Sequence, residues 1–182
     1  MKLKLLILVL ALQSAWLLGT VFVQERALRV GAVVLLETRP VDPRDLLRGD
    51  YVILNYTISS IATNLFVPPL PDSLPHGRTV WVALAPRDGF HEVVRSSLQR
   101  FEPGAGEVLL KAEANWWSGG RNASREVHVE YGLERYYVRE GTGNPRGKIT
   151  VEAVVPTSGR ASIRQVFLNG KPYAEAMKEA AH

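Results

Sequence analysis

The sequence predicts a mainly β protein, a sandwich or partly closed barrel of about eight short antiparallel strands, preceded by one N-terminal transmembrane helix. Three observations support this prediction. Residues 5–23 carry no charged side chain. After Gly31, apolar and polar residues alternate in many short runs, as in strands that bury one face. Prolines, glycines and Asn-Gly or Asp-Gly dipeptides separate these runs, so tight turns are expected between them.

The uncharged N-terminal segment is long enough to cross a membrane. At about 1.5 Å per residue, a helix from Leu5 to Val23 covers roughly 28 Å, close to the hydrocarbon thickness. Lys2 and Lys4 precede it and favour retention of the N-terminus in the cytoplasm. A cleaved signal peptide has a shorter apolar core and small residues at its cleavage site, and both features are missing here. An uncleaved anchor over residues 1–24 is therefore preferred to a signal peptide.

This orientation predicts a single-pass protein of the cell inner membrane with its C-terminal domain outside the cytoplasm. Residues 25–31 should prolong the helix as a short stalk, and residues 32–173 should form the exported β domain. Residues 174–182 are expected to form a C-terminal tail that frays, because they contain good helix formers but little apolar stripe. The length of 182 residues fits one domain with an appendage.

Strand patterns recur through the predicted domain. The clearest run covers residues 149–155, and a Pro-Thr-Ser-Gly turn should return the chain into residues 161–168 as a hairpin partner. Other strands are expected within residues 32–37, 51–58, 80–84, 90–94, 108–112 and 127–131. Residues 64–77 and 115–124 are rich in proline, glycine or tryptophan and are predicted to be loops, where binding usually resides.

Composition argues against several classes of function. The chain has no cysteine, which excludes disulfides, thiolate zinc sites, cysteine nucleophiles and a lipoprotein anchor. The net charge of +4 comes from scattered basic residues, so nucleic-acid binding is not expected. Glu126, His128 and Glu130 alternate on one strand, and we interpret them as a solvated face rather than a metal site. No metal and no cofactor is predicted.

A distinctive motif occupies residues 49–56, which read GDYVILNY. The residues that match G-D-Y-x-x-L-x-Y are Gly49, Asp50, Tyr51, Leu54 and Tyr56. In this motif the chain resembles the bacterial family named after it, the GDYXXLXY proteins. The resemblance extends to the apolar N-terminal helix, to PVDPRDLLRGD and VEYGLERYYVREGTG, and to the closing SGRASI and NGKPY. It implies a membrane-anchored envelope protein, often encoded beside a polytopic membrane protein, and it implies no particular biochemical activity.

A structural role is the preferred interpretation of the motif residues. In an extended strand the even-numbered side chains Val52, Leu54, Tyr56 and Ile58 share one face, and the odd-numbered ones share the other. Both faces are apolar enough to be covered, so a central strand is expected. Gly49 and Asp50 suit the tight turn that enters it. The alternative is a carboxylate site formed by Asp42, Asp45 and Asp50.

Trp116 and Trp117 form the candidate binding loop, because exposed indoles favour partners, glycans or the membrane interface. Core packing of both tryptophans is the alternative. No phosphate-binding or nucleophile-elbow motif is present. We therefore expect a non-enzymatic module that binds another membrane or cell-envelope component. The alternative is a hydrolase of the serine/lysine peptidase type using Ser59 or Ser60 with Lys111, although the Ser-Met dipeptide expected after the anchor of such enzymes is missing.

Overall fold

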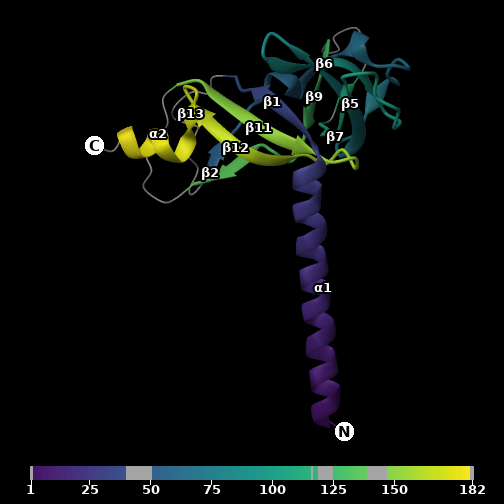
Figure 1. Cartoon of the computed structure of the whole chain (residues 1–182). Coiled ribbons are helices and arrows are strands. Elements are labelled where there is room, and N and C mark those ends of the chain that lie inside the picture. The colour runs from purple at the N-terminus through teal and green to yellow at the C-terminus, as the bar shows by residue number, and fades with distance from the viewer. Residues whose placement is uncertain (1, 40–50, 116, 119–124, 139–146, 181–182) are drawn as a thin grey trace.

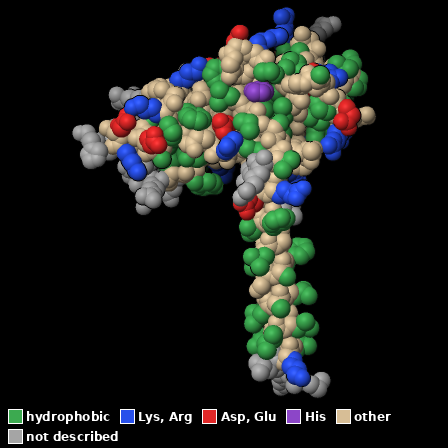
Figure 2. Space-filling model, in the orientation of Figure 1, with side chains coloured by type: hydrophobic (Ala, Val, Ile, Leu, Met, Phe, Trp, Pro, Cys, Tyr) green, Lys and Arg blue, Asp and Glu red, His purple; other side chains and the backbone are tan. Residues whose placement is uncertain are grey.

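The computed structural model describes residues 2–39, 51–115, 117–118, 125–138 and 147–180 as one β domain carried on a long helix (Figure 1). Helix α1 (Lys2–Val30) projects alone from one side of the domain, with the N-terminus at its far end. Apolar side chains cover its visible side (Figure 2). Its segment Lys4–Phe22 has a mean hydropathy of 2.2 and is not buried by the protein. The helix is long and apolar enough to cross a membrane, and it continues to Val30 as the predicted stalk.

Two larger antiparallel sheets form the domain. The four-stranded sheet has the order β1 (Ala32–Glu37), β11 (Ile149–Val155), β12 (Ser162–Leu168) and β13 (Lys171–Pro172). The five-stranded sheet has the order β3 (Ser60–Ala62), β9 (Glu126–Glu130), β7 (Val108–Ala114), β5 (Arg78–Arg87) and β6 (Phe90–Ser97). Alternate side chains of both sheets join one hydrophobic core, as period-two patterning requires.

Two short ribbons and a few helical turns complete the domain. One ribbon pairs β2 (Tyr51–Ile53) with β10 (Arg135–Tyr137), and the other pairs β4 (Ser73–Leu74) with β8 (Trp117–Ser118). The helical elements are η1 (Thr57–Ser59), η2 (Thr63–Leu65) and α2 (Tyr173–Ala180). The mainly β fold behind an apolar helix is confirmed. The described residues hold thirteen strands rather than about eight, because strands of two or three residues leave no alternation to recognise.

The clearest sequence patterns are confirmed in the two sheets. Val80, Val82 and Leu84 are fully buried on β5, and the alternating apolar residues of β11 are buried in the same way. The hairpin of β5 and β6 closes at Asp88-Gly89, and that of β12 and β13 at Asn169-Gly170. All four of these turn residues have positive φ, between 50° and 86°. Two-residue hairpins favour this backbone conformation, so the Asp-Gly and Asn-Gly dipeptides correctly indicated the turns.

The predicted long strand over residues 51–58 is wrong. Strand β2 ends at Ile53, Tyr56 forms an isolated bridge to Thr38, and η1 follows. The even-numbered face is buried as expected, but Asn55 on the other face is exposed. The run is also not central, since β2 pairs only with β10. Residue type predicted extended backbone here, whereas the length of a strand depends on partners from distant parts of the chain.

The expected tail is also more ordered than its sequence suggested. Residues 173–180 form α2, in which Tyr173 and Met177 are buried against the domain. These two residues lie four apart and share one face of the helix, with Ala176 beside them. An apolar stripe this narrow is a weak signal in the sequence. The helix nevertheless packs against the domain, because the aromatic ring of Tyr173 meets Tyr136 edge-on at a centroid distance of 5.5 Å.

A histidine links the two larger sheets. The Nδ1 atom of His91, in β6, accepts a hydrogen bond from the backbone N–H of Leu35 in β1, at 3.1 Å. This bond requires an unprotonated Nδ1. Partial burial lowers the pKa of His91 below 6.5. The folded protein therefore binds fewer protons at this site than the unfolded chain.

We predict that acid weakens this contact. Because the folded-state pKa of His91 is depressed, stability is retained at pH values above 6.5 and lost as the pH falls below it. Melting curves recorded between pH 8 and pH 5 should show this loss as a fall in melting temperature. The variant His91→Gln should reduce the slope of melting temperature against pH. The matched control is His128→Gln, because His128 is exposed on β9. Equal slopes for the wild type and His91→Gln would contradict the prediction.

Candidate functional site

The structure brings together the motif and the later segment YGLERYY, although more than seventy residues separate them in sequence. Strands β2 and β10 pair antiparallel, with Tyr51 opposite Tyr137 and Ile53 opposite Arg135. Beyond the ribbon, the backbone N–H of Leu54 donates to the carbonyl of Glu134 at 2.8 Å. The two segments that carry the family resemblance therefore form one unit.

Two tyrosines exchange hydrogen bonds across this unit. The hydroxyl of Tyr56 donates to the carbonyl of Leu133, and the hydroxyl of Tyr131 donates to the carbonyl of Ile58, each at 2.8 Å. The backbone N–H of Tyr131 donates to Glu134 Oε1 at 2.6 Å. We call Tyr56, Ile58, Tyr131 and Leu133 the tyrosine clamp. All four residues are buried, so each hydroxyl satisfies a carbonyl that water does not reach freely.

The electrostatics of the clamp favour a structural role. Burial raises the pKa of the Tyr56 and Tyr131 hydroxyls far above their ordinary value of 10, and the Glu134 carboxylate raises both further. Both hydroxyls consequently stay protonated and act as hydrogen-bond donors throughout the physiological range. An acid–base catalyst needs a pKa near the working pH. The Leu54 and Tyr56 positions of the motif are thus best explained by packing and hydrogen bonding.

The outer face of the ribbon formed by β2 and β10 carries aromatic rings and an arginine instead of buried tyrosines. The rings of Tyr51 and Tyr137 lie with centroids 6.0 Å apart and tilted by 59°, and the guanidinium of Arg135 lies 5.5 Å from the Tyr51 ring. Tyr137 is 71% exposed. We call Tyr51, Arg135 and Tyr137 the aromatic ribbon. Sequence reasoning placed Tyr51 on a covered face and missed this surface, because the sidedness of two short strands depends on their pairing.

The two stretches predicted as loops contact each other. Leu74 in β4 pairs with Trp117 in β8, and the side chain of Trp117 is half-buried against the core. Earlier in the first stretch, Val67 is 60% exposed and is followed by two exposed prolines. The backbone N–H of Val67 donates to the carbonyl of Ser96 on β6 at 2.8 Å. We call residues 67–70 together with β4 and β8 the paired loops.

The remaining candidate residues have different outcomes. Residues 40–50 and Trp116 lie outside the described residues, so the proposed carboxylates, Gly49 and Asp50 lie there too. Glu126, His128 and Glu130 are exposed along β9, as expected of a solvated face. Within the described part of the chain, no group of three or more His, Asp or Glu side chains is placed to hold a metal ion.

The residues considered as a serine/lysine pair lie apart. Ser60 in β3 pairs with His128 in β9, whose carbonyl accepts a hydrogen bond from Asn115 beyond the end of β7. Lys111 is thus two strands away from Ser60 and four residues further along the sheet. By strand geometry this separation is roughly 9.5 Å across and 13 Å along the sheet. Ser59 is buried, and its backbone N–H donates to Tyr56. A nucleophile and its base must be within hydrogen-bond reach, and these are not.

These features define a class of protein in which a β domain follows one apolar N-terminal helix. The motif of the domain pairs with a segment that is distant in the sequence. The chain belongs to the GDYXXLXY protein family, because the family model matches residues 13–166, which cover most of its length. No curated protein and no solved structure matches the chain significantly.

The tyrosine clamp yields a direct stability prediction. Tyr56→Phe and Tyr131→Phe each remove one hydroxyl and leave a buried carbonyl without that donor, so each should cost about 1–3 kcal/mol of unfolding free energy. Urea denaturation of the purified protein measures this cost. The two losses should not be additive, because the hydroxyls act within the same small unit.

A third tyrosine provides the matched control. The hydroxyl of Tyr173 is buried and has no hydrogen-bond partner among the described residues. Tyr173→Phe removes the same atom without breaking a bond, so it should be neutral or stabilising. If Tyr173→Phe destabilised the protein as much as Tyr56→Phe, loss of the buried hydroxyl's packing, rather than loss of its hydrogen bond, would explain the cost at the clamp.

Proposed function

We propose that this protein is a non-enzymatic module of the bacterial envelope, anchored in the inner membrane by α1, which binds another envelope protein through the paired loops. A polytopic membrane protein is the partner that the family resemblance suggests. The observation that carries the proposal is an exposed apolar segment held rigidly on a membrane-anchored scaffold.

The paired loops have the properties of a binding surface. Val67 and the two prolines after it are exposed, and Leu70 and Trp117 extend the apolar surface towards the core. The hydrogen bond from Val67 to Ser96 and the pairing of β4 with β8 fix the backbone on both sides. Proline and strand pairing reduce the entropy that binding would otherwise remove. An apolar segment that is exposed and already ordered favours a protein partner.

The anchor holds this surface in a defined place. Helix α1 ends at Val30, only Gly31 separates it from β1, and β1 pairs with β11 along its whole length. No flexible linker separates membrane and domain. A partner in the same membrane would therefore meet the loops in a narrow range of orientations, which raises the effective concentration of the bound pair.

Site-specific crosslinking tests the proposal. A photoreactive amino acid at position 67 of the full chain, in native membranes, should give a discrete protein adduct. The variant Val67→Asp should reduce copurification of that partner at least about tenfold, which corresponds to about 1.4 kcal/mol of binding energy. Arg87→Asp is the control, because Arg87 is an exposed residue at the end of β5. A protein extracted only as a free monomer, without adducts at position 67, would refute the proposal.

The proposed topology has its own test. Because the chain has no cysteine, one cysteine introduced by Arg87→Cys should react with an impermeant maleimide in intact spheroplasts. Lys4→Cys should react only after lysis. The opposite pattern would place the domain in the cytoplasm, and a mature N-terminus near Gln24 would show that the anchor is cleaved.

A further inference from the structure

We propose that the aromatic ribbon, formed by Tyr51, Arg135 and Tyr137, rests in the phospholipid headgroup layer of the membrane that α1 crosses. This second membrane contact goes beyond the proposed function. It depends on the anchor and not on any protein partner.

The chemistry of the ribbon suits that layer. A tyrosine side chain has an apolar ring and a polar hydroxyl, a combination enriched at both membrane–water interfaces. An arginine guanidinium matches phosphate oxygens with two parallel hydrogen bonds. Arg135 makes no ion pair with the described residues, and its guanidinium lies 5.5 Å from the ring of Tyr51. Its charge is therefore available for a phosphodiester headgroup.

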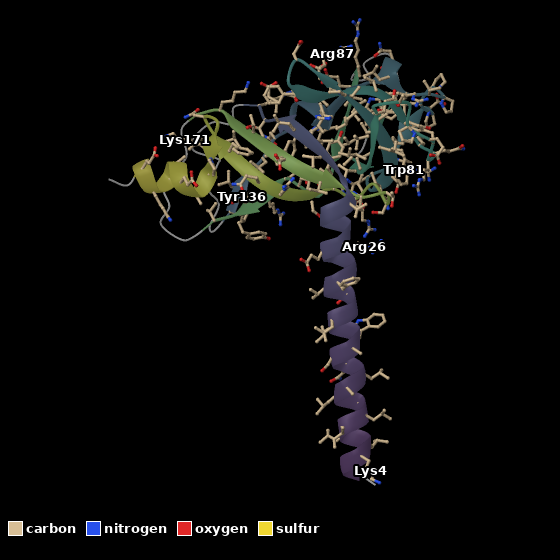
Figure 3. The ribbon with its side chains drawn as sticks, in the orientation of Figure 1. Lys4, Arg26, Trp81, Arg87, Tyr136 and Lys171 are labelled. Carbon is tan, nitrogen blue, oxygen red and sulfur yellow. The ribbon has the colours of Figure 1, made fainter. Side chains whose placement is uncertain are left out.

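The position of the ribbon brings it near the bilayer. Strands β2 and β10 lie on the side of the domain from which α1 leaves, whereas Arg87 lies at the opposite end (Figures 1 and 3). The apolar span ends at Phe22, and the helix then rises about 12 Å to Val30. Headgroups occupy roughly 5–8 Å of this distance on each side of a bilayer. The part of this rise that extends beyond the headgroups is covered by the protruding ring of Tyr137 and by an ordinary helix tilt of about 20°.

The ribbon is also stiff enough to hold its rings at the surface. On its inner side, Tyr136 packs edge-on against Tyr173 of α2 (Figure 3). Behind β2 and β10, the tyrosine clamp joins the motif to β9. Tyr137 is thus exposed on a strand that is paired with β2 and packed on its other face. Because the domain extends sideways from α1, a contact at the ribbon would fix its rotation about the helix axis.

Lipid crosslinking in native membranes tests the contact. Tyr137 replaced by p-benzoylphenylalanine retains an aromatic ring and inserts into C–H bonds on illumination. In the full chain, mass spectrometry should find one phospholipid added to the peptide that contains position 137. The same amino acid at position 87 should give no lipid adduct. A protein adduct alone at position 137, or no adduct, would overturn the proposal.

A charge variant makes the test quantitative. Arg135→Glu, in the background with the photoreactive residue at position 137, should lower the yield of the lipid adduct about fivefold, since one basic residue near an anionic surface contributes on that scale. Arg87→Glu in the same background is the matched control and should leave the yield unchanged. Equal yields for both variants would contradict the role assigned to Arg135. Melting temperatures must match, so that loss of folding is not mistaken for loss of contact.

Purified components separate this proposal from the partner hypothesis. The full chain with the single cysteine of Tyr137→Cys carries a nitroxide label in nanodiscs of phosphatidylethanolamine and phosphatidylglycerol. The ratio of oxygen to nickel-chelate accessibility should be higher at position 137 than at position 87, because oxygen concentrates in the bilayer. Apart from their scaffold protein, these nanodiscs contain no envelope component, so this result can stand even if crosslinking at Val67 finds no partner. Equal ratios at the two positions would overturn the membrane contact.

Discussion

The reciprocal hydrogen bonds between Tyr56, Tyr131 and their carbonyl partners are the interaction on which the rest of the domain depends. The motif connects β1, in the four-stranded sheet, to β3, in the five-stranded sheet. It therefore bridges two sheets whose described strands do not pair with each other. At this crossing the backbone leaves regular strand geometry, and its polar groups need other partners. The clamp supplies two of them inside the core, where an unpaired carbonyl is most costly.

The end of β1 completes this joint. The backbone N–H of Arg39 donates to the carbonyl of Asn55 at 2.7 Å, and Thr38 bridges to Tyr56. The hydroxyl of Thr38 also donates to the carbonyl of Ile149 at the start of β11, at 2.7 Å. The motif is thus held from β1 on one side and from the segment after β9 on the other. His91 adds a second link between the two sheets, through Leu35 in the middle of β1.

Local pattern and long-range pairing account for what the sequence could and could not predict. The strand over residues 149–155 was predictable because its alternation is complete within one element, and so were the turns at Asp88-Gly89 and Asn169-Gly170. The broken backbone of residues 51–58 was not predictable, since β-branched and aromatic residues favour extended structure whether or not a partner strand exists. The burial of Leu54 and Tyr56 was predictable from the alternation of the run.

The outer surface of the candidate site was beyond sequence reasoning for a related reason. A tyrosine in a strand is buried or exposed according to which face of the strand is covered. Which face is covered depends on the register of the strand with a distant segment. Tyr136 and Tyr137 are neighbours in sequence, yet one packs on α2 and the other is exposed. The partial signal was the alternation of Arg135 and Tyr137, which places a charge and a ring on one face.

The joint also connects the anchor to the aromatic ribbon by a short path. Helix α1 passes through Gly31 into β1, β1 is bonded at its end to the motif, and the first residues of the motif strand form the ribbon. No segment of this path depends on an exposed loop among the described residues. This path therefore connects α1 to the aromatic ribbon through paired strands rather than through a linker. Because the clamp holds the strand that carries Tyr51, the membrane contact proposed for the aromatic ribbon rests on the same hydrogen bonds that stabilise the joint.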